Sequence, residues 1–329
     1  MDIYKDIETR TNGEIYIGVV GPVRTGKSTF IKRFMELMVL PAIADENSRK
    51  RAMDELPQSA AGKTVMTTEP KFIPKEAVEV LFEDGVRFQC RLIDCVGYMV
   101  QGAEGHEEDG KERLVKTPWF DYDIPFTKAA EIGTKKVIYD HSTVGIVVTC
   151  DDTVSELGRT SYIQPEMQTI QELKSIGKPF VVLLNSRRPA SPETIELAGK
   201  MEAEYGVSVL PVNCDQLRKT DVVHIFEALL LDFPVTCVRF TIPKWVEALD
   251  LQEEIKQKVI EKTNGIFAKL CLMKDAANYV FEEDDYIQSI RIQSINLSDG
   301  SVDLFLSLKP EYYYAMLSEI MGETIKTEY

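Results

Sequence analysis

Histidine is scarce in this 329-residue sequence, and cysteine occurs without metal-binding spacing. The three histidines, His106, His141 and His224, form no HExxH motif, and the six cysteines form no CxxC motif. A zinc site is therefore not expected. Most cysteines fall in apolar, strand-like segments such as FQCRLIDC and GIVVTC. We expect these to be buried, reduced thiols of a reducing compartment.

Long apolar segments and positive charge are also lacking. No stretch approaches about 18 apolar residues, so a membrane-spanning helix is not expected. The polar N-terminal segment MDIYKDIETRTNGEI does not resemble a secretory signal. Lys and Arg total 38 against 53 Asp and Glu, for a net charge of −15. This charge argues against nucleic acid or a bare anionic membrane as the main partner, although a local basic patch is compatible with it.

Length and composition predict a globular chain of about two domains, with 44% hydrophobic residues. In residues 1–237, apolar runs alternate with helical patterns, which predicts an α/β domain with a mainly parallel sheet. The predicted strands are Glu14–Val20, Val86–Asp94, Val144–Cys150, Phe180–Asn185 and Val207–Asn213. The predicted helices are Lys27–Leu40, Ala129–Asp140, Pro165–Ile176, Pro192–Glu204 and Asp221–Leu231.

The sequence after Pro234 predicts a second, small α+β domain, which we assign to residues 238–329. A strand in VTCVRFTIP precedes an amphipathic helix over about residues 244–262. Two strands then flank an Asp299-Gly300 hairpin turn, and a last helix follows. Their ranges are Tyr286–Ile295, Val302–Leu308 and Glu311–Met321. This βαββα order is that of a ferredoxin-like fold with one strand missing.

Residues 21–28, GPVRTGKS, match the pattern GxxxxGK[ST] in full. They stand between the strand EIYIGVV and the helix STFIKRFMELM, which argues against a plain glycine turn with a surface lysine. We interpret them as the phosphate-binding loop of a P-loop nucleoside triphosphatase. Lys27 is expected to reach the β- and γ-phosphates and Ser28 to coordinate Mg²⁺. The other candidate nucleotide-binding residues here are Gly21, Arg24, Thr25, Gly26 and Thr29.

Asp94 and Gly97 form a DxxG pattern at a predicted strand end, about 70 residues after the loop. Asp94 is a candidate to hold Mg²⁺ through water, and Gly97 is a candidate amide donor to the γ-phosphate. Alone the pattern is weak, because a turn aspartate also explains it. Its position at a strand end strengthens the interpretation.

Thr67 and Thr68 lie in KTVMTTEP, about 40 residues after the loop. Switch GTPases place there a threonine that binds Mg²⁺ and orients the attacking water. We take both threonines as catalytic candidates, with Thr68 as the working metal ligand although either one fits. Strand threonines or a turn before Pro70 are the alternative.

Residues 185–188, NSRR, stand where GTP-specific relatives carry NKxD. The Asp of that motif accepts hydrogen bonds from guanine, whereas Arg188 has only donors. Each buried guanine donor left unpaired costs about 1–3 kcal/mol. We therefore predict ATP, or weak base selectivity, with Asn185 and Arg188 near the base. The alternative is that another acidic residue of this chain takes the role of the NKxD aspartate and accepts the hydrogen bonds from guanine.

Catalysis also departs from the common pattern, because Tyr98 follows DxxG where a water-positioning glutamine is frequent. A tyrosine is not a general base near pH 7. Arg24 is a candidate to bridge the α- and γ-phosphates as an arginine finger in cis. A solvated or inter-subunit arginine is the alternative. The catalytic candidates are Arg24, Lys27, Thr67, Thr68 and Asp94.

Several segments together resemble the stage IV sporulation protein A family, the spore-coat morphogenetic ATPases of endospore-forming bacteria. They are IYIGVVGPVRTGKSTFIKRFMEL, DELPQSAAGKTVMTTEPKF, RLIDCVGY, AAEIGTKKVI and NSRRP, which together cover most of residues 1–237. The DELPQSAAGKT stretch is far more specific than a phosphate loop alone. Residues 238–329 resemble the family's middle region more loosely.

The resemblance implies a translation-factor-related GTPase-like fold, ATP and Mg²⁺ as cofactors, and hydrolysis that drives self-assembly into the basement layer of the spore coat. The family's Walker A lysine, sensor threonines and Walker B aspartate match Lys27, Thr67, Thr68 and Asp94. It also implies a homopolymer at the outer forespore surface, in the mother-cell cytoplasm. The resemblance further implies recruitment by a small amphipathic membrane peptide, stage V sporulation protein M, and coat and cortex proteins that build on the polymer. The net charge of −15 argues against nucleic acid as a partner.

The chain is shorter than the family's proteins, with roughly the last third of their length absent. The resemblance assigns membrane-peptide recognition and polymer formation largely to that part, so the expected partners are those of the longer proteins. Two other functions stay open from the residues alone. One is a regulatory GTPase of the ribosome-assembly type, and the other is a nucleotide-binding scaffold without turnover.

Overall fold

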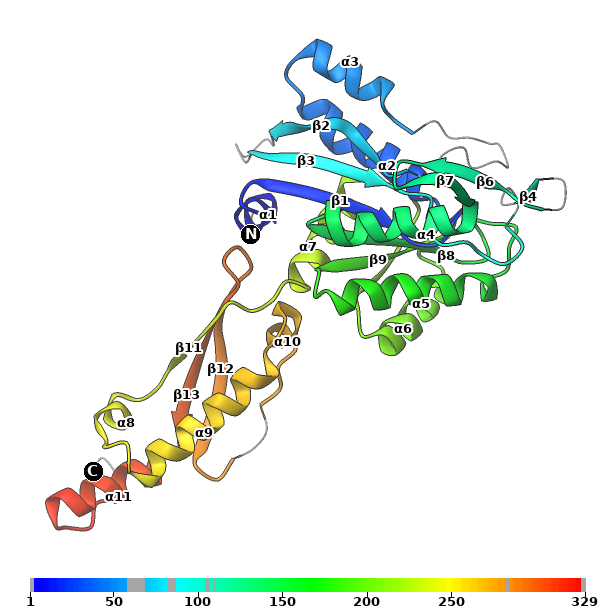
Figure 1. Ribbon diagram of the computed structural model, residues 1–329. Helices are drawn as coiled ribbons and strands as arrows, with labels where there is room; N and C mark the ends of the chain where they lie inside the picture. Colours follow the sequence, from blue (N-terminus) through cyan, green and yellow to red (C-terminus); the bar gives the residue numbers. More distant parts are fainter. Residues whose placement is uncertain are drawn as a thin grey trace. The chain divides into compact units, whose positions relative to one another are not determined.

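The computed structural model describes residues 3–57, 69–81, 87–103, 107–108, 111–281 and 284–326. The chain divides into two compact units, residues 1–232 and residues 233–329. The first unit contains a six-stranded sheet and the second a three-stranded sheet (Figure 1).

The six-stranded sheet has the strand order β10-β9-β8-β1-β3-β2. All neighbouring strands run parallel except β2, which is antiparallel to β3. The mainly parallel α/β sheet that the sequence predicts is therefore confirmed. The bounds are β1 (Glu14–Val20), β2 (Lys71–Leu81), β3 (Arg87–Asp94), β8 (Val144–Cys150), β9 (Phe180–Asn185) and β10 (Val209–Val212).

Helices cover this sheet, as continuous apolar strands require. Every residue of β8 and β9 is buried. One layer of the core packs side chains of α5 and α6, and of the turn that ends α4, against these strands. The helices are α1 (Ile3–Arg10), α2 (Lys27–Phe34), α3 (Glu46–Asp54), α4 (Phe126–Lys136), α5 (Thr160–Ser175), α6 (Pro192–Tyr205) and α7 (Lys219–Leu231).

Two small additions accompany these helices. π-Helical turns continue α2 through Met35–Val39 and α4 through Val137–His141. Short hairpins precede α4, formed by β4 (Glu107–Glu108) with β5 (Lys111–Glu112) and by β6 (Leu114–Thr117) with β7 (Phe120–Pro125). Neither β2 nor these hairpins follow from the apolar and turn patterns of the sequence.

The second unit has the sheet order β11-β13-β12. Strand β11 (Cys237–Thr241) is parallel to β13 (Ser301–Leu308), and β12 (Ile287–Asn296) is antiparallel to β13. Gly300 has a φ of 73° in the turn between β12 and β13, a conformation that glycine adopts without strain. With α9 (Glu254–Lys269) and α11 (Pro310–Met321), the main elements follow the predicted βαββα order.

The helix predicted over residues 244–262 is two helices. α8 (Lys244–Ala248) ends at Leu249, which is extended, and α9 begins at Glu254. The Lys256 amine donates to the carbonyl oxygens of Glu247 at 2.9 Å and Leu249 at 2.6 Å. The break is stable because a side chain satisfies carbonyls that a continuous helix would otherwise pair. A further short helix, α10 (Met273–Ala277), follows α9.

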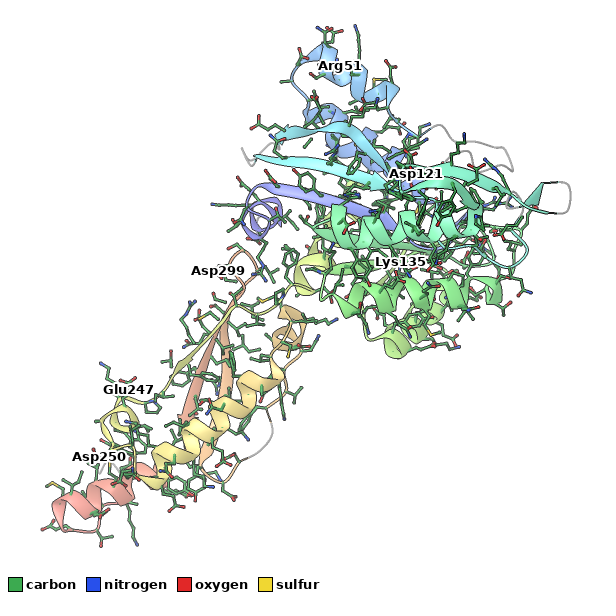
Figure 2. The ribbon with its side chains drawn as sticks, in the orientation of Figure 1. Arg51, Asp121, Lys135, Glu247, Asp250 and Asp299 are labelled. Atoms are coloured by element: carbon green, nitrogen blue, oxygen red, sulfur yellow. The ribbon has the colours of Figure 1, made fainter. Side chains whose placement is uncertain are left out.

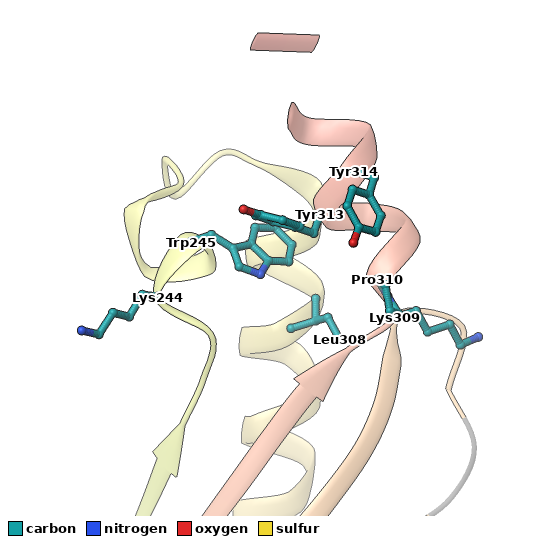
Figure 3. A pocket seen from close by; sticks show the side chains of 7 residues that line it. All are labelled: Lys244, Trp245, Leu308, Lys309, Pro310, Tyr313 and Tyr314. Atoms are coloured by element: carbon teal, nitrogen blue, oxygen red, sulfur yellow. The ribbon is translucent and has the colours of Figure 1, made fainter. Parts of the chain in front are cut away.

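An open groove of about 500 Å³ lies between α8 and α11 (Figure 3). The ring of Tyr313 lies 5.7 Å from that of Trp245 and 5.6 Å from that of Tyr314, measured between centroids. Lys244 and Lys309 flank these rings. The groove has no glycine-rich loop and no carboxylate in its lining, so it does not carry the predicted nucleotide chemistry.

The cysteines are free thiols. Four are buried, as predicted for most of them, and two are exposed in the second unit; in chain order they are Cys90, Cys95, Cys150 and Cys214, then Cys237 and Cys271. Among the described residues, no helix combines the length and apolar character needed to cross a bilayer.

Candidate functional site

The loop of residues 21–26 connects β1 to α2 at the carboxyl edge of the parallel sheet. Asp94 is paired with Val19 in the sheet register, and Asn185 is paired with Cys150. Parallel strands end at the same edge, so the sheet brings Asp94 and Asn185 to this loop. Ligand sites of open α/β sheets lie at such edges.

Two glycines allow the loop to pass close to its neighbours. At Gly21, with φ 127°, an added β-carbon would lie 2.4 Å from the Val148 carbonyl oxygen. At Gly26, with φ 99°, it would lie 2.4 Å from the Asn185 side-chain amide. Arg24 also has a positive φ, 61°, and its side chain is exposed. The positive φ values give the loop a backbone conformation that glycine adopts without strain and that most other residue types disfavour.

Lys27 is buried within the turn that the loop makes. Its side chain is 5% exposed, and its amine donates to the Pro22 carbonyl oxygen at 2.5 Å. The fully buried Thr25 donates its hydroxyl to the same oxygen at 3.0 Å. Burial lowers the pKa of Lys27. Thr29, two residues further on in α2, is half-buried.

Ser28 and Asp94 meet beside Lys27. The Ser28 hydroxyl donates to Asp94 Oδ2 at 2.8 Å, and no described residue donates to the buried Asp94 Oδ1. Burial raises the pKa of Asp94, and the bond from Ser28 opposes that rise. A carboxylate oxygen without a partner next to a hydroxyl is a donor set that suits a hard divalent cation such as Mg²⁺.

Gly97 approaches the loop more closely than a larger residue could. An added β-carbon at Gly97, with φ 94°, would lie 2.1 Å from the Gly21 carbonyl oxygen and 2.6 Å from the Lys27 amine. The DxxG pattern therefore lies against the GxxxxGK[ST] segment. A group bound by the Lys27 amine would lie next to the Gly97 backbone.

Asn185 links two loops at this edge. Its side chain is 5% exposed, its Nδ2 donates to the Thr25 carbonyl at 2.9 Å, and its Oδ1 accepts from the Cys214 amide at 3.0 Å. The side-chain amide thus ties the loop after β1 to the loop after β10. Its role in the described structure is to position the loops, and both of its polar atoms are engaged in doing so.

Ser186 and Arg188 occupy different environments. Ser186 is fully buried, and its hydroxyl accepts from the Arg188 amide at 3.0 Å. The Arg188 side chain is exposed. Near Ser186, Asp151 Oδ1 accepts from the Thr153 hydroxyl at 2.5 Å and Oδ2 accepts from the Thr194 hydroxyl at 3.3 Å. Asp151 is not among the residues that the sequence motifs predict, although its position directly after β8 is a signal for it.

Two predicted residues lie outside the described part of the chain. Thr67 and Thr68 belong to the interval between residues 57 and 69, so their placement is not described. Among the described residues, no group of three His, Cys, Asp or Glu side chains has the arrangement of a metal site. The candidate cation site beside Lys27 differs from that kind, since it pairs one carboxylate with one hydroxyl.

Two family models match consecutive parts of the chain. Residues 1–234 match the model described as stage IV sporulation protein A, ATPase domain. Residues 235–329 match the model described as stage IV sporulation protein A, middle domain. Together the two matches cover the chain.

Similar curated proteins carry the same name. Stage IV sporulation protein A of Clostridioides difficile (strain 630) is 46% identical over 330 residues, which is 100% of this chain and 67% of that protein. Those of Bacillus subtilis (strain 168) and Bacillus anthracis are 44% and 43% identical over 328 residues, 99% of this chain and 67% of each. Among solved structures, the crystal structure of an SsGBP mutation variant aligns at 16% identity with a TM-score of 0.36, covering 68% of this chain and 56% of that chain. This last alignment does not establish a shared fold.

Proposed function

This chain belongs to the stage IV sporulation protein A family, and from that premise we propose that its first unit is a P-loop ATPase that binds ATP with Mg²⁺ and hydrolyses it. The family model that matches residues 1–234 is that of an ATPase domain. The observation that carries the proposal is the buried Lys27 beside the Ser28–Asp94 pair, with Asp94 Oδ1 unpartnered among the described residues.

Each side chain of this site has a role in the proposal. Lys27 exchanges the Pro22 carbonyl for oxygens of the β- and γ-phosphates, and the amides of the Gly21–Gly26 loop hold the remaining phosphates. Ser28 and Asp94 hold Mg²⁺, which when bound neutralises charge on the phosphates. The chemistry is in-line attack of water on the γ-phosphate, with Lys27 stabilising the charge of the transition state.

Three further residues complete the proposed site. Thr67 and Thr68 sense the γ-phosphate, and one of them is a ligand of Mg²⁺. Arg24 acts as an arginine finger in cis, which the exposed side chain and its place within the loop support. Hydrolysis by an Arg24→Ala chain at the native rate, with unchanged nucleotide affinity, would exclude the catalytic role of Arg24.

The base is proposed to be adenine. Asn185 uses its amide within the protein, and Arg188 presents donors only. A guanine edge would therefore lack the acceptor that an NKxD aspartate supplies. The second candidate, a regulatory GTPase of the ribosome-assembly type, predicts the opposite preference.

The wider function is proposed from family membership. ATP hydrolysis drives self-assembly into the basement layer of the spore coat, on the outer forespore surface in the mother-cell cytoplasm. Stage V sporulation protein M provides an indirect contact with the membrane, and coat and cortex proteins are further partners. Nucleic acid is not a partner, in keeping with the net charge of −15.

Phosphate release under multiple-turnover conditions tests the proposal. We expect release from ATP that requires Mg²⁺ and is lost in Lys27→Ala, while Lys200→Ala, at an exposed lysine of α6, keeps the native rate. Competition of ATP and GTP for a labelled nucleotide tests the base, and preferential displacement by GTP would favour the GTPase. Binding without turnover would favour a nucleotide-bound scaffold.

A further inference from the structure

Tyr98, which directly follows Gly97, has no role of its own in the proposed nucleotide site. Its main chain is attached to the loop after β1. The Tyr98 amide donates to the Gly21 carbonyl at 3.3 Å, and the Tyr98 carbonyl accepts from the Val23 amide at 2.9 Å. A parallel bridge also joins Pro22 and Tyr98. The position of Gly97 therefore depends on how Tyr98 is held.

The side chain of Tyr98 is held at its far end. It is 4% exposed, and its hydroxyl donates to Glu172 Oε2 on α5. Glu172 Oε1 lies 3.6 Å from the amine of Lys135, which projects from α4 in Figure 2, and 3.5 Å from the side-chain amide of Gln168. The phenol thus connects the loop beside Lys27 to two helices.

Packing alone does not require the Tyr98 hydroxyl or its hydrogen bond to Glu172. Burial raises the pKa of Tyr98, and the hydrogen bond to Glu172 adds to the rise. The phenol therefore keeps its proton at neutral pH and acts as a donor. A phenylalanine would fill the same space without a hydroxyl and a largely buried carboxylate, both of which have a desolvation cost. The polar contact fixes a position that an apolar ring would fix less well.

Gly97, which precedes Tyr98 in the chain, is the residue that borders the loop. The Gly97 backbone borders the Lys27 amine, since an added β-carbon would lie 2.6 Å from it. In the proposed site Lys27 binds the β- and γ-phosphates, and the Gly97 backbone is the candidate donor to the γ-phosphate, which ADP lacks. The α- and β-phosphates also bind the loop amides, so a change at Gly97 affects them less.

We propose that Tyr98 and Glu172 are positioning residues that hold the Gly97 backbone beside Lys27, so that the site distinguishes a nucleoside triphosphate from a diphosphate. The inference rests on the proposed function, because it requires a γ-phosphate at Lys27. It gives Tyr98 a role other than that of a base or a water-positioning residue.

Competition titrations of the 329-residue chain with Mg²⁺ test it, using ADP and a slowly hydrolysed ATP analogue. Tyr98→Phe and Glu172→Ala each remove the contact, and we expect about a five-fold or greater loss of affinity for the analogue, with ADP affinity within about two-fold. Glu172→Gln keeps an acceptor oxygen for the phenol and is expected to retain the affinity for the analogue. Thermal unfolding of each variant establishes that it is folded.

Tyr205→Phe is the matched control. The Tyr205 hydroxyl donates to Glu166 Oε1 at 2.8 Å, a similar phenol–carboxylate contact between α6 and α5. Its removal is expected to leave the ratio of the two affinities unchanged. Equal weakening of both nucleotides by Tyr98→Phe and Glu172→Ala, or no weakening, overturns the inference alone. A native chain that binds neither nucleotide overturns the proposed function and the inference with it.

Discussion

Lys27 and Asp94 are both buried, and burial displaces the pKa of each toward the value that favours its neutral form, downward for Lys27 and upward for Asp94. Each charge therefore has a desolvation cost in the free chain. Asp94 Oδ1 has no donor among the described residues, which adds to that cost. Such groups are retained at ligand sites because the ligand, and not the protein, satisfies them.

Asp94→Asn is expected to stabilise the nucleotide-free chain at neutral pH. Because the folded-state pKa of Asp94 is raised, the associated stability is complete below its unfolded pKa, about 4, and is lost as the pH rises through the folded pKa. The asparagine has no such proton to lose. We expect equal Tm values near pH 4 and a gain of about 2–4 °C at pH 7, for about 1 kcal/mol.

Differential scanning calorimetry across this pH range measures the effect. Asp121→Asn, at an exposed carboxylate, is the control and is expected to leave Tm unchanged. A gain for Asp94→Asn that is the same at every pH would contradict the linkage. The same variant is expected to lose Mg²⁺-dependent ATP hydrolysis.

Gly97→Ala is expected to lower the free energy of unfolding by more than the strain of an alanine at a positive φ explains. An alanine at a positive φ costs about 1–2 kcal/mol, and here its β-carbon would also lie 2.1 Å from the Gly21 carbonyl oxygen. Gly177, with φ 65° and no atom within 4 Å of an added β-carbon, is the matched position. In urea unfolding we expect Gly177→Ala to lose about 1 kcal/mol and Gly97→Ala clearly more. Equal losses would show that the contact with Gly21 relaxes freely.

Elements differ in how well the sequence predicts them. β1, β8 and β9 have the predicted bounds because each is a continuous apolar run between polar or turn residues. β2 was not predicted, since Lys71–Leu81 mixes charged residues with Pro74 and pairs only with β3 at the sheet edge. A strand that is half solvated lacks the pattern of a buried one.

Contacts at the site also differ in whether the sequence predicts them. Lys27 and Ser28 could be placed together with Asp94 from the sequence, because two motifs with known geometry carry them. The contact of Asp151 with Thr194 was not predictable, since it joins residues 43 positions apart and belongs to no motif. Asp151, directly after β8, meets Thr194 of α6 only because the sheet orders β8 beside β9.

Arg159 and Glu166 anchor the first turns of α5, and breaking this pair is expected to cost about 3–5 kcal/mol. Arg159 makes two bonds of 2.7 Å to Glu166, which is 0% exposed. Arg159→Met leaves that buried carboxylate without its cationic partner, with the Tyr205 hydroxyl as a remaining donor, while the double variant with Glu166→Met is expected to recover most of the stability. Guanidinium unfolding measures both.

The exposed pair of Lys200 and Glu196 is the control for this prediction. The Lys200 amine lies 2.6 Å from Glu196 Oε1, but the two side chains are 71% and 66% exposed. Lys200→Met is expected to change the free energy of unfolding by less than about 1 kcal/mol. A loss for Arg159→Met as small as this one would show that burial does not govern the strength of the pair.

At the scale of the whole chain, the boundary between the two compact units falls after residue 232, and the boundary between the two family models falls after residue 234. Every described contact of the candidate site lies within residues 1–232. The groove at Trp245 belongs to the second unit and has different chemistry. The described residues of the proposed nucleotide site therefore all belong to the first unit.

A chain that ends at Asp232 is expected to bind ADP with Mg²⁺ within about two-fold of the 329-residue chain. The reason is that the described contacts of the site join residues that all precede that point. Isothermal titration calorimetry measures the affinity, and circular dichroism checks the fold. A folded short chain with ten-fold weaker binding would show that the second unit contributes to the site.

The division of buried and exposed cysteines has a practical consequence for chemical labelling. Burial raises the pKa of Cys90 and Cys150 to about 12, and Cys95 and Cys214 are buried as well. Alkylation requires an accessible thiolate, so a maleimide dye added to the folded protein reacts at Cys237 and Cys271. The unmodified sequence thus carries its own attachment points for a fluorophore, and both report on the second unit while the ATPase unit stays dark.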